Sequence, residues 1–264
     1  MKRTNAIITT ANDKDTLFLE SDWISIPELN SPVLIVLKTD QIGPEEFGRM
    51  KSFLSGQEIT KSHRFRFSDD RKSYIVVHGF LRWMLGRHLG IPPEAIEFTC
   101  GLYGKPSVSG YFRKMFFNLS HSSGVSVFAF DPDYEIGVDV ERINEEFEYE
   151  PIVKQFFTQN EGQYILDSGV VSNKRFYEIW TRKEAYLKAV GAGITKGLDV
   201  EVLKEKINGN SFLENGTGRM DFLFRTMIYD LHFQIALAMD IDSPGIHAYV
   251  IKKTGNRLPI NKFL

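Results

Sequence analysis

Trp180, Glu184 and Lys188 recur at intervals of four residues within the sequence WTRKEAYLKA. In a helix, residues at this spacing share one face, and Gly191 follows at a position that can end such a helix. A carboxylate and an ammonium group one turn apart suggest a rigidly held site. The same spacing also occurs in surface ion pairs worth only about 0.2–0.5 kcal/mol, so these residues need partners from elsewhere in the chain.

A pair of acidic residues in the sequence GVDVER offers such partners. Asp139 and Glu141 alternate with Gly137, Val138 and Val140, and on a strand residues two apart point to the same side. Two carboxylates on one side of an apolar strand repel each other and lose hydration, so they favour a bound cation. With the glutamate of the helix they make three carboxylates, and oxygen ligands of this number suit Mg²⁺. Two solvated acids on a strand edge would show the same alternation.

Ser120 and His121 stand where a predicted strand meets a turn. Neighbouring side chains on an extended chain point apart, so this pair is not by itself a catalytic dyad. A serine-rich turn with a histidine can hold a phosphate through hydroxyl, backbone N–H and imidazole groups, or it can be purely structural. Lys105, between Gly104 and Pro106, places a further charge on a stiff loop.

A basic stretch in the first third of the chain could contact phosphate, although most of its side chains are expected to be solvated. Its members are Lys61, His63, Arg64, Arg66, Arg71 and Lys72.

Composition and charge exclude several classes of protein. The chain has 264 residues, a net charge of −2 and a pI of about 6.3, whereas nucleic-acid binders usually carry a basic balance. Cys100 is the only cysteine, so no disulfide framework is expected and a reducing compartment is favoured. The first residues lack the apolar core of a signal peptide, and no run approaches the roughly 18–20 apolar residues of a membrane span. We expect a cytoplasmic protein with no membrane or nucleic-acid partner.

Apolar runs and turn residues predict an α+β chain in two halves, residues 1–133 and 134–264. In the first half, Ser68 is the expected N-cap of a helix that stops at Gly90. Strands are expected at residues 31–40, 96–100, 116–120 and 125–130. In the second half, a strand at 136–141 is followed by helical stretches at 151–157 and around Trp180, and then by strands at 231–239 and 247–253. Residues 158–174 and 208–218 are expected to be irregular.

Five short motifs occur in one order along the chain: YGKP (103–106), FNLSHS (117–122), GVDVE (137–141), FF (156–157) and WTRKEAYLKA (180–189). Together they resemble the surfactin-type 4′-phosphopantetheinyl transferases, over about residues 60–200. The resemblance implies two similar α/β half-domains related by pseudo-twofold symmetry in a monomer, with coenzyme A bound between them. It also implies an activity: transfer of the phosphopantetheine arm of coenzyme A to a serine of an apo acyl, peptidyl or polyketide carrier protein, with release of adenosine 3′,5′-bisphosphate.

The resemblance further implies roles for individual residues. Asp139, Glu141 and Glu184 would be the Mg²⁺ ligands, and Glu184 or a water it holds would be the base for the carrier serine. Lys188 would lie beside the pyrophosphate and assist the leaving group. Lys183 would do similar supporting work in binding coenzyme A. Lys105, Ser120 and His121 match family positions that contact the phosphates of coenzyme A. Trp180 would be structural.

The chain departs from the family pattern at one position. Members often carry an arginine on the first long helix that reaches the 3′-phosphate of coenzyme A. Ser73 stands at that position here, with Arg71 two residues earlier, so Arg71 is the candidate replacement. The segment 158–174 matches the region that helps to receive the carrier protein. Two other functions are compatible with the chemistry of these residues: a metal-dependent phosphohydrolase or nuclease, and a non-catalytic coenzyme A-binding module.

Overall fold

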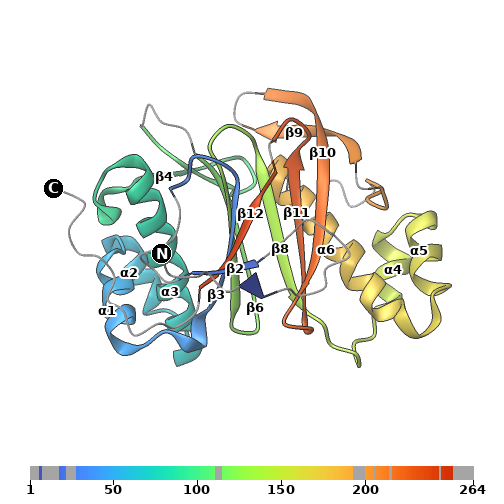
Figure 1. Ribbon diagram of the computed structural model, residues 1–264, viewed down its shortest axis with the longest axis horizontal. Coiled ribbons are helices and arrows are strands. Elements are labelled where there is room, and N and C mark those ends of the chain that lie inside the picture. The colour runs from blue at the N-terminus through green and yellow to red at the C-terminus, as the bar shows by residue number, and fades with distance from the viewer. Residues whose placement is uncertain are drawn as a thin grey trace.

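Two β-sheets lie face to face in the centre of the computed structural model, and helices cover the outer face of each sheet (Figure 1). The structure describes residues 28–110, 115–192, 200–204, 206–213, 216–243 and 245–251, together with the short strands at 6–7 and 18–21. The resulting order of layers is helix, sheet, sheet, helix. The predicted α+β fold of two α/β halves is confirmed.

The first sheet has six strands in the order β1-β2-β12-β3-β7-β6. These strands are β1 (Ala6–Ile7), β2 (Phe18–Ser21), β3 (Val33–Lys38), β6 (Phe116–Ser122), β7 (Val125–Asp131) and β12 (His247–Ile251). The second sheet has four strands in the order β8-β11-β10-β9. These are β8 (Ile136–Arg142), β9 (Lys206–Leu213), β10 (Gly216–Tyr229) and β11 (Phe233–Asp240). A separate hairpin joins β4 (Phe98–Cys100) to β5 (Pro106–Val108).

One long helix covers each sheet. The helices beside the first sheet are α1 (Pro44–Ser52), α2 (Gly56–Ser62) and α3 (Ser68–Leu89), with short 3₁₀ turns at Thr39–Gln41 and Pro93–Ala95. The helices beside the second sheet are α4 (Glu150–Phe156), α5 (Gln159–Leu166) and α6 (Ser172–Val190), with a 3₁₀ turn at Gly169–Val171. Gly90 and Gly191 end α3 and α6 in the left-handed conformation, with φ of 72° and 69°. Glycine adopts this conformation without steric cost, and both ends agree with the sequence.

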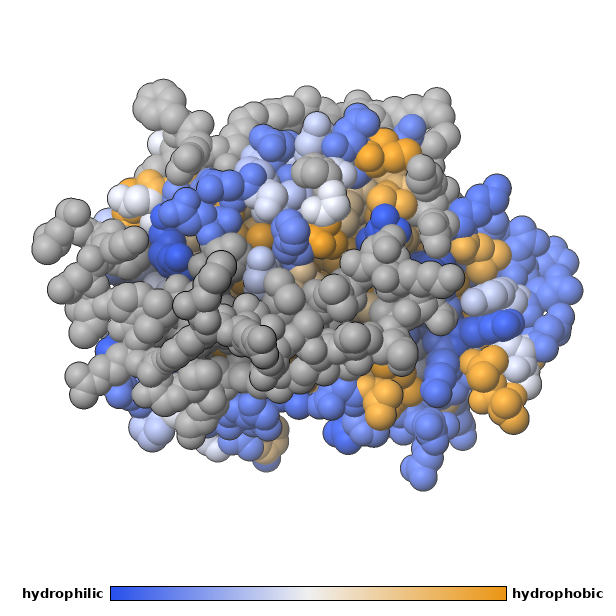
Figure 2. Space-filling view, in the orientation of Figure 1, coloured by the Kyte–Doolittle hydropathy of each residue, from blue (hydrophilic) through white to orange (hydrophobic). Residues whose placement is uncertain are grey.

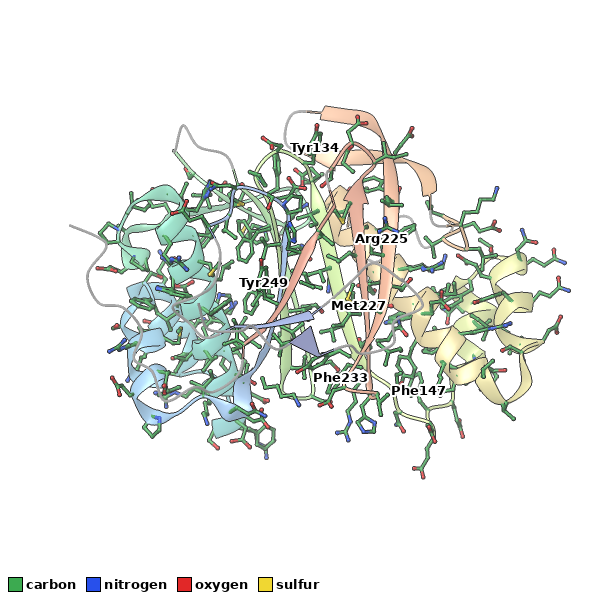
Figure 3. The ribbon with its side chains drawn as sticks, in the orientation of Figure 1. Tyr134, Phe147, Arg225, Met227, Phe233 and Tyr249 are labelled. Atoms are coloured by element: carbon green, nitrogen blue, oxygen red, sulfur yellow. The ribbon has the colours of Figure 1, made fainter. Side chains whose placement is uncertain are left out.

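Three hydrophobic cores hold the layers together. The first lies between α3 and the outer face of the first sheet, and the third lies between α6 and the outer face of the second sheet. The middle core joins the two sheets; Met227 and Phe233, labelled in Figure 3, belong to it. Along β8 the residues alternate: Ile136, Val138 and Val140 enter the middle core, so the residues between them face α6.

The expected division at residues 133 and 134 needs one correction. The chain does pass from β7 of the first sheet to β8 of the second at this point. However, β12 returns from the second half and pairs in parallel with β3 and β2 in the first sheet. Apart from His247, the residues of β12 are mostly apolar, and Ala248, Val250 and Ile251 are buried in an interior position of that sheet. The two halves are therefore interleaved at the C-terminal strand.

Two segments expected to be irregular are regular. Residues 206–213 and 216–229 form the paired antiparallel strands β9 and β10, although the glycines and asparagines around 208–218 suggested a loop. Residues 158–174 contain α5, which begins with a capping box: the Thr158 hydroxyl accepts from the backbone N–H of Glu161, and the Glu161 carboxylate accepts from the N–H of Thr158. The sequence T-x-x-E is a readable signal for such a start. The N-cap of α3 is Phe67, one residue before the expected Ser68.

Among the helices that the structure describes, none is long and apolar enough to cross a membrane.

Candidate active site

Strand β8 and helix α6 approach so closely that only glycine fits at their contact. A Cβ atom placed on Gly137 would lie 2.0 Å from the backbone oxygen of Ala185 and 2.5 Å from the backbone nitrogen of Ala189. Real Cβ contacts are never this short, so the side chain must be absent. This contact places Asp139 and Glu141, which share a face of β8 with Gly137, opposite α6.

The centre of the site is a network around the carboxylate of Asp139. Lys188 Nζ of α6 lies 2.7 Å from Asp139 Oδ1, and the Ser120 hydroxyl of β6 donates to the same oxygen at 2.7 Å. Lys188 Nζ also donates to Ser120 Oγ at 3.0 Å. The second carboxylate oxygen, Oδ2, is buried and has no hydrogen-bond partner among the described residues. Two strands and a helix therefore converge on one carboxylate, whose second oxygen has no partner among the described residues.

Glu184 adds a second available oxygen. Its Oε1 is buried and also lacks a partner within the described part of the chain. Burial, followed by the negative charge of Asp139, raises the pKa of Glu184 to about 6, while Lys188 acts in the opposite direction. Unpaired buried carboxylate oxygens are rare because the lost hydration is not replaced. Two of them in one place indicate a site that is completed by something bound.

Glu141 is the third carboxylate of the set. The Ser122 hydroxyl donates to its Oε2 at 3.1 Å, and the indole N–H of Trp180 also donates to it. Burial and then the charge of Asp139 raise its pKa, against these hydrogen bonds and Lys188. Trp180 stacks against Phe157 as well, so it is both a packing residue and a hydrogen-bond donor to the site.

The donor set fits a hard divalent cation that keeps part of its water shell. In the described ranges no three His, Cys, Asp or Glu side chains are arranged so that they could hold a metal ion by themselves. Mg²⁺ does not require such a cage, because it is commonly bound by one or two carboxylates, water and substrate phosphates. The unpartnered oxygens of Asp139 and Glu184 meet that requirement. Glu141 as a direct ligand stays a prediction.

Lys183 does not belong to this site, which corrects its expected role beside coenzyme A. Its Nζ is buried in an ion pair with Glu161 at 2.8 Å, donates to the carbonyl of Val200 and lies over the Phe157 ring. Successive helical residues point about 100° apart. Lys183 therefore points into the core of the second half, whereas its neighbour Glu184 faces the site.

Ser120 and His121 are separated by the alternation of strand β6, which continues through Ser122 and reaches a turn only at Ser123 and Gly124. Ser120 joins the Asp139 network, whereas His121 is exposed. Its pKa is lowered by loss of hydration and by the charges of Lys188 and His78, and raised by Asp139 and Asp70. The Ser120 hydroxyl contacts Asp139 and Lys188, and the expected contacts of Ser120 and His121 with coenzyme A stay predictions.

Lys105 and Arg71 lie apart from the carboxylates. Lys105 Nζ is buried, pairs with Glu135 at 2.5 Å and donates to the carbonyl of Ala189 at 2.7 Å. It thus joins the β4–β5 hairpin to the end of α6. Arg71 lines a groove of about 370 Å³ between α1 and the start of α3, where Lys51 is a further cation. Their expected contacts with coenzyme A stay predictions.

Comparison with known proteins places these residues in a family. Residues 135–236 match the model of the 4′-phosphopantetheinyl transferase superfamily, and residues 41–133 match the model of the 4′-phosphopantetheinyl transferase N-terminal region. The 4′-phosphopantetheinyl transferase HetI of Nostoc sp. is 34% identical over 152 residues, which cover 56% of this chain and 64% of HetI. A putative 4′-phosphopantetheinyl transferase of Synechocystis sp. is 32% identical over 165 residues, covering 62% of this chain and 67% of the relative.

The chain belongs to the 4′-phosphopantetheinyl transferase superfamily. Sfp of Bacillus subtilis, also named a 4′-phosphopantetheinyl transferase, is 26% identical over 197 residues, covering 74% of this chain and 86% of Sfp. The predicted family is therefore confirmed, and the names of the relatives support the predicted enzyme class.

Proposed function

We propose that this chain transfers the 4′-phosphopantetheine group of coenzyme A to a serine of an apo carrier protein. The observation that carries the proposal is a pair of buried carboxylate oxygens, on Asp139 and Glu184, that have no partner among the described residues and lie beside the ammonium group of Lys188. This combination of negative and positive groups suits a pyrophosphate that arrives with Mg²⁺. The type of reaction is inferred from the family to which the chain belongs.

The reaction exchanges one phosphorus–oxygen bond for another. The carrier serine oxygen attacks the phosphorus that bears pantetheine, and the bond from this phosphorus to the oxygen of adenosine 3′,5′-bisphosphate breaks. Mg²⁺ bound by Asp139, Glu184 and, as predicted from the sequence, Glu141 would neutralise charge on the pyrophosphate. The proton of the serine hydroxyl passes to a base.

Glu184 is the proposed base. In the metal-free protein its pKa is raised to about 6, so its carboxylate is a stronger proton acceptor than an ordinary glutamate and is still largely ionised at pH 7. Lys188 has a side chain that is 29% exposed, so its ammonium group can meet the leaving phosphate. Ser120 holds Lys188 and Asp139 together through one hydroxyl, which fixes the geometry of both charges.

The surface of α5 and the following 3₁₀ turn is the proposed carrier-binding face. Leu166, Val170 and Val171 are exposed there, with Val170 fully so. Figure 2 shows separate hydrophobic patches among hydrophilic atoms at the α4–α5 end. Phe147, in the connection between β8 and α4 (Figure 3), is 39% exposed. Apolar side chains grouped on a surface are typical of protein-binding sites.

Three further parts of the proposal concern the setting of the reaction. The protein acts as a monomer, because the residues of β6, β8 and α6 that form the site all come from one chain. It works in the cytoplasm, where coenzyme A and apo carriers occur together. The carriers serve fatty acid, polyketide or nonribosomal peptide synthesis.

Intact-mass spectrometry of carrier proteins tests the proposal. The protein is incubated with coenzyme A, Mg²⁺ and a panel of apo carriers, with and without a chelator. A carrier that gains one phosphopantetheine mass, only without chelator and not with Asp139→Asn, supports the proposal. Breakdown of coenzyme A in the absence of any carrier would favour a phosphohydrolase, and binding of coenzyme A without either reaction would favour a binding module.

A further inference from the structure

The two sheets meet at strands β6 and β8, which are each the last strand of their sheet. β6 pairs through its backbone with β7, and β8 pairs with β11. Across the junction, side chains of β6 take the place of a backbone ladder. These side chains belong to the second, fourth and sixth residues of the motif FNLSHS, which are Asn118, Ser120 and Ser122.

The first of these contacts fixes register. Asn118 Oδ1 accepts a hydrogen bond from the backbone N–H of Val138 at 3.1 Å, and both groups are buried. Because Val138 precedes Asp139 directly, this bond fixes the position of β8 along β6 beside the carboxylates.

The two serines then make matching contacts. Each hydroxyl accepts one hydrogen bond and donates another to a carboxylate. Ser120 Oγ accepts from Lys188 Nζ and donates to Asp139 Oδ1. Ser122 Oγ accepts from the backbone N–H of Arg142 at 3.1 Å and donates to Glu141 Oε2. Since a hydroxyl has only one hydrogen to give, accepting from a fixed N–H directs that hydrogen to the carboxylate.

We propose that Asn118 and Ser122 are positioning residues of the active site: they set the register of β8 against β6 and hold the Glu141 carboxylate in the orientation needed to bind a divalent cation. Sequence reasoning missed both residues, because it ended the strand at Ser120 and read the following residues as a turn. The inference rests on the proposed function, since it assigns these contacts to the cation site of that function. Residues that orient metal ligands typically change metal affinity or activity by about 10–100-fold when they are lost.

The test compares Ser122→Ala with Ser126→Ala. Ser126 lies on β7, is buried, and its hydroxyl has no hydrogen-bond partner among the described residues, so its removal takes away the same atom without breaking a contact. Ser122→Thr restores a hydroxyl. Mn²⁺ binding is measured by electron paramagnetic resonance on the full chain, with and without coenzyme A. The Mg²⁺ concentration at half-maximal transfer and the rate at saturating Mg²⁺ are measured in parallel.

The expected result is a loss of Mn²⁺ affinity of about 10-fold in Ser122→Ala, with an equal rise in the half-saturating Mg²⁺ concentration. The rate at saturating Mg²⁺ should fall by less than about threefold, because the Glu141 ligand itself remains. Ser126→Ala matches the wild type, and Ser122→Thr recovers most of the affinity. Asn118→Ala lowers Mn²⁺ affinity in the same direction and also lowers the melting temperature, because the Val138 N–H loses its partner.

Two outcomes overturn the inference, and they differ. If the wild type binds Mn²⁺ and needs Mg²⁺ for transfer but Ser122→Ala binds it equally well, the positioning role is wrong and the proposed function stands. If the wild type neither binds Mn²⁺ nor transfers phosphopantetheine, the proposed function fails and the inference fails with it. A melting temperature measured for every variant separates loss of folding from loss of binding.

Discussion

Helix α6 carries two lysine–carboxylate pairs of nearly the same length and opposite character. Lys183 lies 2.8 Å from Glu161, and Lys188 lies 2.7 Å from Asp139. In the first pair the side chains are 1% and 0% exposed; in the second the lysine side chain is 29% exposed. The two lysines are five residues apart in one motif, so sequence spacing does not separate a structural pair from a functional one.

The difference lies in how completely each carboxylate is satisfied. In Glu161, Oε1 accepts from the backbone N–H of Val202, and Oε2 accepts from Lys183 and from the backbone N–H of Thr158. In Asp139 only one of the two oxygens has partners in the described structure. A buried carboxylate with partners on both oxygens holds the fold together. A carboxylate with a buried oxygen that lacks a partner can bind a ligand through that oxygen.

The largest expected effect concerns the structural pair. Lys183→Met leaves the buried Glu161 charge without its cation, so the free energy of unfolding should fall by about 3–5 kcal/mol. Urea denaturation measures this loss. The double variant Lys183→Met, Glu161→Leu removes both charges and should recover part of it. A loss below about 1 kcal/mol for the single variant would show that the pair behaves like an exposed one and would remove the contrast.

Lys188→Met tests the other member of the comparison. Because the ammonium group is proposed to stabilise developing charge on the leaving phosphate, kcat/KM for transfer should fall about 100-fold, or roughly 2.7 kcal/mol. The free energy of unfolding should fall by less than it does in Lys183→Met, because the Lys188 side chain is 29% exposed and its ion pair is therefore less completely removed from water. Steady-state kinetics and urea denaturation of both variants check whether Lys183→Met mainly loses stability and Lys188→Met mainly loses activity. Equal losses of stability with no kinetic effect at Lys188 would contradict it.

The contrast explains which parts of the site could be predicted from the sequence. The alternation around Asp139 and the four-residue spacing of Glu184 and Lys188 are local, so strand and helix periods were enough to place them. Lys183 could not be assigned this way, because its partner Glu161 lies on α5, in a segment that was expected to be irregular. The capping box of that helix was present in the sequence and would have revealed it.

Long-range pairing sets the other limit. The apolar run of β12 was recognisable as a strand, yet its parallel pairing with β3 and β2 depends on contacts between the ends of the chain. The role of Ser122 depends on β8 lying beside β6 without backbone pairing. Neither relation leaves a local pattern, so the order of the strands and the junction between the sheets had to come from the structure.

Glu58 on α2 extends the comparison between Glu161 and Asp139 to the first half of the chain. Burial alone would raise its pKa, but hydrogen bonds from His78 and the N–H of Ser55, together with the charge of Arg82, lower it to about 2. Its ionised form is therefore favoured by folding. This contribution is fully present above the ordinary pKa of 4.5 and is lost as the pH falls toward 2.

Glu58→Gln should consequently lower the free energy of unfolding by roughly 2 kcal/mol at pH 7 and by much less near pH 3. Denaturation curves at the two pH values measure the difference, and Glu45→Gln, in an exposed pair with Arg49, is the matched control. A loss that does not depend on pH would mean that Glu58 contributes by packing. It would then no longer belong with Glu161 as a satisfied carboxylate.

The smallest expected effect is an increase in the free energy of unfolding, and it is expected only for a carboxylate that lacks a partner until a ligand binds. Burial and the charge of Asp139 raise the pKa of Glu184, so its ionised form is disfavoured in the folded, metal-free protein. Above pH 6, Glu184→Gln in the presence of a chelator should therefore increase the free energy of unfolding by about 1 kcal/mol, while transfer activity is lost. Glu161→Gln should destabilise the protein under the same conditions. If both variants were destabilised alike, Glu184 would be a structural carboxylate, and its unpartnered oxygen would not mark a site for a ligand.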